Sequence, residues 1–304
     1  MKILLFGGTG RCGRVLGEWL SEAGHELLAP AHGDCDLRDA AAVSRLVLGC
    51  GAEAVVNAAA ISGPETCLDD PLTAHGVNAM APAAMALACR HTGARLIHLS
   101  TDYVLDGRRA GLKDESAKCR PINVYGESKR EGELEVLEAL PEALVVRVSW
   151  ICGNPQKPSF VESTLAKALA AQPLAAIADK FSLPTDARDI AAALAALLQE
   201  PEGDRTAGVV QLCSGGEPMS WHGCASAALR CAVELGALPS MPELREQRLD
   251  EASFFRDARP RHTAMSNARL AARLSRLPGA PVLPEAQLCL RRVTERYLRA
   301  VGAL

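Results

Sequence analysis

Tyr125 and Lys129 are four residues apart, so in a helix both side chains lie on the same face. A phenol can donate a proton, but its ordinary pKa is about 10. A neighbouring ammonium favours the phenolate and brings the phenol closer to the range in which it exchanges protons at neutral pH. Thr101 follows an apolar run, and its hydroxyl could hold a reacting oxygen. These residues predict acid catalysis; a helix-surface pair without chemistry is the alternative.

A glycine-rich segment directly follows the first apolar run and reads G-x-x-G-x-x-G. Small residues let the backbone approach a pyrophosphate, and the following helix offers free N–H groups and a positive dipole. We therefore expect a dinucleotide cofactor to bind here, although an ordinary tight turn between strand and helix would use the same residues. The expected cofactor contacts in this segment are Gly7, Gly10, Arg11, Cys12 and Gly13.

No acidic residue ends the second predicted strand, where residues 30–33 read Pro-Ala-His-Gly. An acid there would bind the adenosine ribose of NAD, so its absence argues against strict NAD preference. Arg11 could reach a 2′-phosphate and favour NADPH, with NADH still open; a solvated residue at a helix start is the alternative. Asp36 and Leu37 could flank the adenine, although Asp36 could equally cap the next helix.

Small residues also end the third apolar run, where Ala58, Ala59 and Ala60 follow Asn57. At the carboxyl end of a parallel strand, small side chains leave room for a ligand. We expect all three alanines to contact the cofactor. Close packing of a helix on the sheet is the alternative, and both can hold.

Short apolar runs alternate with helical spacing along the first half of the chain. Continuous apolar strands separated by helices are typical of a parallel sheet covered on both faces. Right-handed crossovers then predict an α/β fold with a doubly wound, Rossmann-type sheet. The predicted strands are 3–6, 26–29, 54–57, 95–99, 144–148, 174–177 and 208–212, and the predicted helices are 11–23, 39–49, 72–92, 124–139, 160–171, 186–199, 220–235, 266–276 and 284–300.

The regular alternation of predicted strands and helices ends after Trp150, and residues 153–158 are predicted to form a loop. We expect residues 1–150 plus about 179–212 to form the dinucleotide-binding domain. A smaller substrate-binding lobe would contain residues from about 151 to 178 and from 213 to 304. This second part would be interwoven with the first, because a helix and a strand between the two segments could extend the sheet.

Composition narrows the classes of function. The 304 residues include 33 Lys plus Arg and 36 Asp plus Glu, a formal net charge of −3, so nothing supports nucleic-acid binding. No apolar run is long enough for a membrane span or a signal-peptide core. The 11 cysteines form no CxxC pair and no cluster with metal spacing. We expect a soluble, reduced, cytoplasmic protein without a metal.

These residues resemble the extended branch of the short-chain dehydrogenase/reductase superfamily, which modifies nucleotide sugars. Within it, the chain is similar to the dTDP-4-dehydrorhamnose reductase family. The main matches are Leu99 to Gly107 (LSTDYVLDG), Pro121 to Glu133 (PINVYGESKREGE) and Val55 to Ala60 (VVNAAA). Shorter matches at 146–150, 183–189, 220–221 and 259–260 extend the resemblance over nearly the whole chain.

The resemblance implies a bound NAD(P), NADPH in the first place, and a catalytic set of Thr101, Tyr125 and Lys129. Tyr125 and Lys129 would also contact the cofactor. A nucleotide sugar would bind between the carboxyl edge of the sheet and the C-terminal lobe. The family is also compatible with a homodimer.

Val104, Trp150 and Phe160 match positions near the substrate of the family. Core packing is the alternative for the two aromatic residues. The chain departs from the family pattern at residues 61–67 and at Lys180, where a Gln is usual, and it lacks a C-terminal Trp. These departures all lie on the substrate side.

The expected activity is therefore NAD(P)H-dependent reduction of a nucleotide-linked 4-keto-6-deoxy sugar. Hydride would go to the sugar carbonyl carbon, and Tyr125 would protonate its oxygen. Two alternatives stay open. One is a non-catalytic NADP-binding regulatory subunit. The other is a nucleotide-sugar epimerase or dehydratase on the same fold, for which the paired carboxylates typical of dehydratases are missing beside Thr101.

Overall fold

A parallel sheet of six strands forms the centre of the computed structural model, which describes all residues 1–304. The strand order is β10-β5-β4-β3-β1-β2, and every neighbouring pair is parallel. The expected doubly wound α/β sheet is therefore confirmed. The strands are β1 (Lys2–Phe6), β2 (Glu26–Leu28), β3 (Ala54–Asn57), β4 (Arg95–Thr101), β5 (Leu144–Val148) and β10 (Gly208–Leu212).

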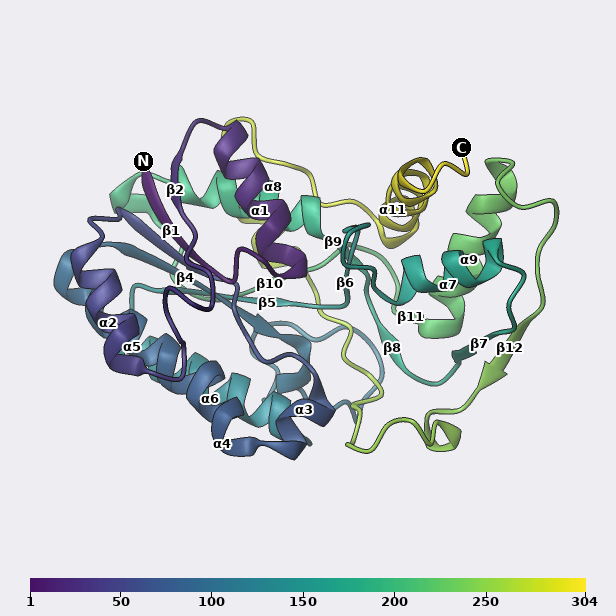
Figure 1. The fold of residues 1–304 in the computed structure, drawn as a ribbon, viewed down its shortest axis with the longest axis horizontal. Helices are drawn as coiled ribbons and strands as arrows, with labels where there is room; N and C mark the ends of the chain where they lie inside the picture. The colour runs from purple at the N-terminus through teal and green to yellow at the C-terminus, as the bar shows by residue number, and fades with distance from the viewer.

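Helices cover both faces of this sheet (Figure 1). On one face, Leu16 and Ile190 belong to a core cluster with alternate strand residues. On the other face, Val43, Met85 and Val136 join a second cluster with the remaining strand residues. Because strand side chains alternate between faces, strands buried on both sides must be apolar throughout. The first face is covered by α1 (Arg11–Glu22) and α8 (Ala187–Leu198), the second by α2 (Ala40–Gly49), α5 (Ala81–Thr92) and α6 (Val124–Ala139).

A separate apolar core lies in the C-terminal lobe, to the right of the sheet in Figure 1. Leu165, Leu229 and Leu290 come from its three main helices and are fully buried there. The lobe contains α7 (Phe160–Leu169), α9 (Trp221–Glu234), α11 (Ala286–Ala300), and the paired strands β7 (Leu174–Ile177) and β12 (Leu244–Gln247).

Short elements join the sheet to the lobe. The two-residue strands were not expected, because hydrophobic periodicity needs longer segments to be visible. Helix α10 (Ala268–Leu274) lies in the range expected for the lobe, but its Leu270 and Leu274 pack into the sheet core. The connecting strands are β6 (Ile151–Cys152), β8 (Phe181–Ser182), β9 (Thr185–Asp186) and β11 (Met219–Ser220), and the 3-10 turns are η2 (Asp102–Val104), η3 (Glu202–Asp204) and η4 (Leu249–Glu251).

The helix expected over residues 72–92 is interrupted. It consists of α4 (Pro71–His75), the π-helical turn η1 (Gly76–Met80) and α5, and it follows a further short helix, α3 (Pro64–Asp69). Asn78 in the π-turn is fully buried and bonds to both backbone groups of Ile61 and to Ser128 Oγ. Gly132 allows this close approach, since a Cβ there would lie 2.2 Å from the Asn78 carbonyl oxygen.

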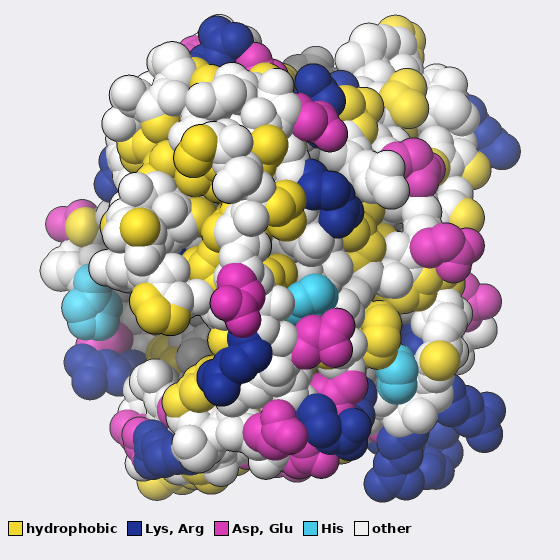
Figure 2. All heavy atoms as spheres, turned by 90° about the vertical axis from the view of Figure 1, so that its right-hand side faces the viewer, with side chains coloured by type: hydrophobic (Ala, Val, Ile, Leu, Met, Phe, Trp, Pro, Cys, Tyr) yellow, Lys and Arg dark blue, Asp and Glu magenta, His cyan; other side chains and the backbone are white.

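The outer face of the C-terminal lobe carries side chains of both charge signs (Figure 2). Basic and acidic groups are interspersed with hydrophobic ones, and no continuous basic surface is visible on this face. None of the helices is both long and apolar enough to cross a lipid bilayer. No group of three or more His, Cys, Asp or Glu side chains is arranged to hold a metal ion, and all cysteines are free thiols.

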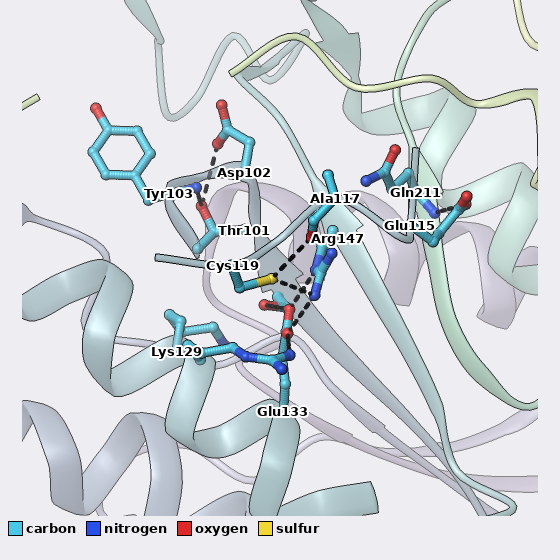
Figure 3. Close-up of polar contacts among 12 residues, drawn as sticks. Thr101, Asp102, Tyr103, Glu115, Ala117, Cys119, Lys129, Glu133, Arg147 and Gln211 are labelled. Carbon is cyan, nitrogen blue, oxygen red and sulfur yellow. Dashed lines mark hydrogen bonds and ion pairs between the residues drawn. The ribbon is translucent and has the colours of Figure 1, made fainter. Parts of the chain in front are cut away.

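A buried ion pair attaches α6 to the sheet (Figure 3). Arg147 on β5 donates from Nε and Nη2 to the two oxygens of Glu133 on α6, each at 2.8 Å. Ser100 on β4 donates to the same carboxylate at 2.6 Å, and Arg130 donates at 2.7 Å. Burial alone would raise the pKa of Glu133, but the bonds from Arg147 hold it below its ordinary value. The carboxylate therefore stays charged and fixes α6 to two strands.

We predict that Glu133→Ala destabilises the protein by about 3–5 kcal/mol, because it leaves the Arg147 guanidinium buried without its counter-charge. The free energy of unfolding from urea titration measures this loss. Glu138→Ala, on an exposed position of the same helix, should change stability by less than about 0.5 kcal/mol. Equal effects of the two substitutions would contradict the role of the buried pair.

Candidate active site

Two adjoining cavities lie at the carboxyl ends of β1, β3 and β4. The first, about 420 Å³, is lined by Thr101, Tyr125 and Lys129. The second, about 240 Å³, extends from Gly7 towards the end of β2. The two share Gly10 and Ala58 to Ala60, so they form a continuous depression across the sheet edge. Other lining residues of the first cavity are Arg11, Cys12, Tyr103, Trp150, Phe160 and Trp221, and of the second Pro30, His32, Cys35 and Leu37.

Three glycines shape the loop between β1 and α1. At two of them, neighbouring backbone atoms leave no room for a side chain. Gly7 has a φ of 80°, and a Cβ there would lie 2.6 Å from the Ala59 nitrogen. At Gly13 a Cβ would lie 2.1 Å from the Gly7 carbonyl oxygen. At Gly10 the nearest atom would be the same oxygen at 3.1 Å. Gly10 is therefore the position at which a side chain would mainly enter the cavities.

The N-terminus of α1 has free donors facing this depression. Its N-cap is Gly10, no side chain caps it, and its first turn contains no acidic residue. The uncapped N–H groups and the helix dipole suit an anion. Cys12, on the first turn, is a buried thiol whose pKa is raised by burial to about 12, so it stays neutral.

The structure gives Arg11 a different environment from the one expected. Its Nε donates to the Lys157 carbonyl at 3.0 Å and its Nη2 to the Pro158 carbonyl at 3.4 Å. Arg11 lines the catalytic cavity and not the one near Pro30, where an adenosine ribose would lie. The loop carbonyls hold the guanidinium on the side of the first cavity, and the expected reach of Arg11 to a 2′-phosphate stays a prediction.

Asp36 does not cap the next helix, which was the alternative interpretation of this residue. Its two carboxylate oxygens bind the Arg38 side chain, while Asp39 caps α2 by accepting from the Ala41 and Ala42 N–H groups at 3.0 Å. Leu37 lines the second cavity and Asp36 does not. Of the two residues expected near an adenine, only Leu37 faces the depression.

Helix α6 brings Tyr125 and Lys129 to the end of β4. The helix begins after Asn123, whose side chain accepts from the Gly126 N–H at 2.8 Å. Burial raises the pKa of Tyr125, and a hydrogen bond with Thr101 opposes this shift. Burial lowers the pKa of Lys129 to about 8, and the charge of Glu133 opposes this shift.

The spacing suggested that the Lys129 ammonium acts directly on the pKa of the Tyr125 phenol. The structure shows Lys129 turned towards other partners. Lys129 Nζ donates to the Leu99 carbonyl at 2.6 Å and lies 3.3 Å from His98 Nε2. In this arrangement burial dominates the phenol, which remains protonated. A neutral phenol beside the Thr101 hydroxyl is a suitable proton donor for an oxygen bound between them.

Tyr103, and not Val104, faces the catalytic cavity. The short turn η2 directs Tyr103 towards Tyr125, with ring centroids 5.5 Å apart in an edge-to-face arrangement. Val104 is fully buried and packs with Leu105 and Leu183. The Val104 side chain therefore does not line the cavity, because the turn points it into the core and Tyr103 outward.

Aromatic residues are rare in this chain and gather at the site. The sequence has only three Trp, three Tyr and five Phe residues, so their clustering is informative. Trp150, with a φ of 42°, stacks on Trp221 at 5.5 Å, and Phe160 lies 5.1 Å from Trp221. Trp150 Nε1 is buried without a hydrogen-bond partner. Trp150 and Phe160 thus line the cavity as expected from their positions, and Trp221 was missed.

Comparison with known proteins places this geometry in a family. Residues 1–279 match the family model described as RmlD substrate binding domain. The chain belongs to this family. The resemblance to the extended short-chain dehydrogenase/reductases is thereby confirmed, and the chain is an oxidoreductase of that type.

Two relatives and one solved structure share a name. The dTDP-4-dehydrorhamnose reductase of Mycolicibacterium smegmatis is 34% identical over 71% of this chain and 64% of its own length. The reductase of that name from Shigella flexneri is 31% identical over 96% of this chain and 97% of its own length. The fold also matches the dTDP-4-dehydrorhamnose reductase of Bacillus anthracis in complex with NADP, with a TM-score of 0.84, 23% identity, and coverage of 96% and 98%.

We predict that Gly10→Val weakens NADPH binding at least about tenfold, about 1.4 kcal/mol, because the branched side chain would project over the N-terminus of α1. The thermal midpoint should stay close to that of the native protein, since a Cβ at this position meets only one backbone atom. Fluorescence titration with NADPH measures the affinity. Gly203→Val, at a glycine with open space around it, serves as the control, and native affinity in the Gly10 variant would contradict this placement.

Proposed function

We propose that this protein uses NADPH to reduce the 4-keto group of a nucleotide-linked 4-keto-6-deoxy sugar, as the reductases of its family are named. The observation that carries the proposal is the convergence of Thr101, Tyr125 and Lys129 in a cavity continuous with the glycine-loop depression. Family membership supports the same activity. A small-molecule nucleotide sugar is then the partner of the site.

The residues present fit a dinucleotide cofactor. The small side chains of Ala58 to Ala60 and the uncapped start of α1 leave space and donors for a pyrophosphate between the two cavities. Leu37 and Pro30 would lie at the adenosine end, and Lys129 at the nicotinamide end. When bound, NADPH supplies the hydride. The relative solved in complex with NADP supports this cofactor.

Tyr125 is the proposed proton donor to the carbonyl oxygen. Its burial keeps the phenol protonated until a substrate oxygen arrives, and Thr101 would orient that oxygen by a hydrogen bond. Tyr103, Trp150 and Trp221 would form the apolar walls that exclude water around the sugar. The unpartnered Trp150 N–H is suited to a sugar hydroxyl or a phosphate oxygen.

A third cavity is the proposed binding site for the nucleotide of the sugar nucleotide. It has a volume of about 890 Å³, runs along β7 and β12, and shares Phe160 and Trp221 with the catalytic cavity. Lys167 and Arg245 line it together with Glu243, and neither of the two cations forms a salt bridge. Apolar walls with two uncompensated cations suit a base and its phosphates.

The first experiment is incubation with NADPH or NADH and a panel of nucleotide-linked 4-keto sugars, followed by the loss of nicotinamide absorbance. Reduction of at least one sugar is expected. Tight NADPH binding without any turnover would instead favour the regulatory-subunit alternative. Epimerised or dehydrated products without net oxidation of NADPH would favour the other alternative, a nucleotide-sugar epimerase or dehydratase.

We predict that Tyr125→Phe lowers kcat by about 10²–10⁴-fold, because it removes the transferable proton and keeps the ring. NADPH affinity and the thermal midpoint should change little. Thr101→Val should lower kcat less, since only an orienting hydrogen bond is lost. Steady-state kinetics on any accepted sugar measure these effects.

The matched control for this prediction is Tyr103→Phe, which removes the other phenol hydroxyl of the same cavity. It should retain most of the kcat, because Tyr103 does not hydrogen-bond Thr101 through its side chain. A Tyr125→Phe enzyme with native kcat would show that the proton comes from elsewhere.

We also predict that Arg245→Ala raises KM for the sugar nucleotide about 10–100-fold, the effect of losing a charged hydrogen bond of about 1.5–3 kcal/mol, with kcat nearly unchanged. Arg248→Ala, whose exposed partner is Asp250, is the control and should leave KM near native. Unchanged KM in the Arg245 variant would exclude the β7–β12 cavity as the nucleotide site.

A further inference from the structure

A chain of buried polar side chains lies beneath Lys129 and connects three elements. Asn57 on β3, His98 on β4 and Lys129 on α6 are each at most 1% exposed. Asn57 Nδ2 lies 3.0 Å from His98 Nδ1, and Lys129 Nζ lies 3.3 Å from His98 Nε2. His98 thus touches a side-chain amide on one ring nitrogen and the lysine on the other.

The direction of the first hydrogen bond is fixed by the backbone. The Ala59 N–H donates to Asn57 Oδ1 at 3.1 Å, so the oxygen of this amide faces Ala59 and the NH₂ group faces His98. An NH₂ group can only donate, and His98 Nδ1 must therefore accept. Burial holds the pKa of His98 well below its usual value, so the ring is neutral. A neutral ring that accepts at Nδ1 carries its proton on Nε2.

This tautomer determines which group of His98 faces Lys129 Nζ. The His98 Nε2–H group points at Lys129 Nζ, so it can donate to the lone pair of a neutral amine. An ammonium has no lone pair and would face this N–H as a second donor. The Leu99 carbonyl accepts from Nζ in either charge state. We propose that Asn57 and His98 are positioning residues that present an N–H donor to Lys129 and thereby favour its uncharged amine.

The other charged groups around Lys129 do not replace this effect. Glu133, one turn along α6, opposes it by favouring the ammonium, but its carboxylate is already bonded to Arg147, Arg130 and Ser100. Other titratable groups in the elements packed against α6 have partners of their own or face solvent. His75 pairs with Glu131, Glu65 with Arg259, Asp69 with Arg256, and Arg95 with Glu200. Asp102 accepts from Ser149 and Ser182, Arg90 donates to the Ala139 carbonyl, and His91 is exposed. His98 is the ionisable side chain in direct contact with Nζ.

The consequence rests on the proposed function. A lysine with its ordinary pKa is charged at all times near neutral pH. A lysine whose charged and neutral forms are close in free energy can take up a proton from solvent during turnover, once the Tyr125 phenol has given its own proton to the substrate oxygen. Protonation of Lys129 would then require His98 to move its proton to Nδ1, against the Asn57 NH₂ group. Since Asn57 is held by Ala59, the charge of Lys129 is linked to a loop that lines the cofactor cavity.

The test uses NMR of the ligand-free protein labelled with ¹⁵N, and it needs no activity. Correlation of ring protons with ring nitrogens identifies the tautomer of each histidine, and His98→Gln assigns the His98 signals. At pH values above the titration midpoint of Lys129, we expect His98 to carry its proton on Nε2. An Nδ1–H tautomer under these conditions overturns the proposal, whether or not the protein reduces a sugar.

Asn57→Asp reverses the polarity of the contact, because a carboxylate oxygen accepts from Nδ1–H and leaves Nε2 free to accept from an ammonium. We expect the Lys129 titration, followed at its side-chain signals, to rise by about one pH unit or more, tenfold in proton affinity. In His98→Phe, the same Asn57→Asp change should have a clearly smaller effect, since only the bare charge remains. An unchanged titration, or an equal rise in both backgrounds, overturns the proposal.

Lys180 provides an internal control within each variant. It is also fully buried, burial lowers its pKa to about 8, and its Nζ donates to the Pro260 carbonyl at 2.8 Å with no contact to His98. Its titration should stay in place in Asn57→Asp. A parallel shift of both lysines would indicate a general change of the fold and would also count against the proposal.

Discussion

Helix α6 must bury charged side chains against an apolar sheet, and much of the structure follows from this constraint. A buried charge is tolerated only when it is paired and fully hydrogen-bonded. Glu133 meets the requirement through Arg147 and Ser100, which come from neighbouring strands. Lys129 has no carboxylate partner; burial lowers its pKa to about 8, and its Nζ donates to the Leu99 carbonyl at the end of β4. The functional face of α6 is therefore held in register with the strand ends.

The same constraint explains why the site is at the boundary between sheet and lobe. The carboxyl ends of β1, β3 and β4 expose backbone donors and small side chains, and they need a cover to exclude water. Trp150, Phe160 and Trp221 supply that cover from segments that follow β5. Trp150, with its unusual φ, contributes its ring to this cluster at the edge of the lobe core. Backbone conformations of this kind are often retained at ligand sites.

Burial acts in opposite directions on the two central titratable groups. It raises the pKa of Tyr125 and lowers that of Lys129 to about 8, so burial stabilises the uncharged form of each relative to water. The simple expectation that a nearby lysine activates the phenol considers only charge. In the folded protein, the orientation of Lys129 towards β4 and the low polarity of the cavity decide the outcome.

The sequence alone determined the sheet, the glycine loop and the placement of Tyr125 and Lys129 on one helix face, because these depend on local periodicity and spacing. The predicted spans 124–139, 144–148 and 208–212 coincide with α6, β5 and β10. Tertiary structure alone decided what depends on side-chain direction and distant partners. The η2 turn placed Tyr103 and not Val104 at the cavity, and the carbonyls of residues 157 and 158 accept hydrogen bonds from Arg11. The Asn57–His98–Lys129 contacts join residues 41 and 31 positions apart, and no local pattern records such contacts.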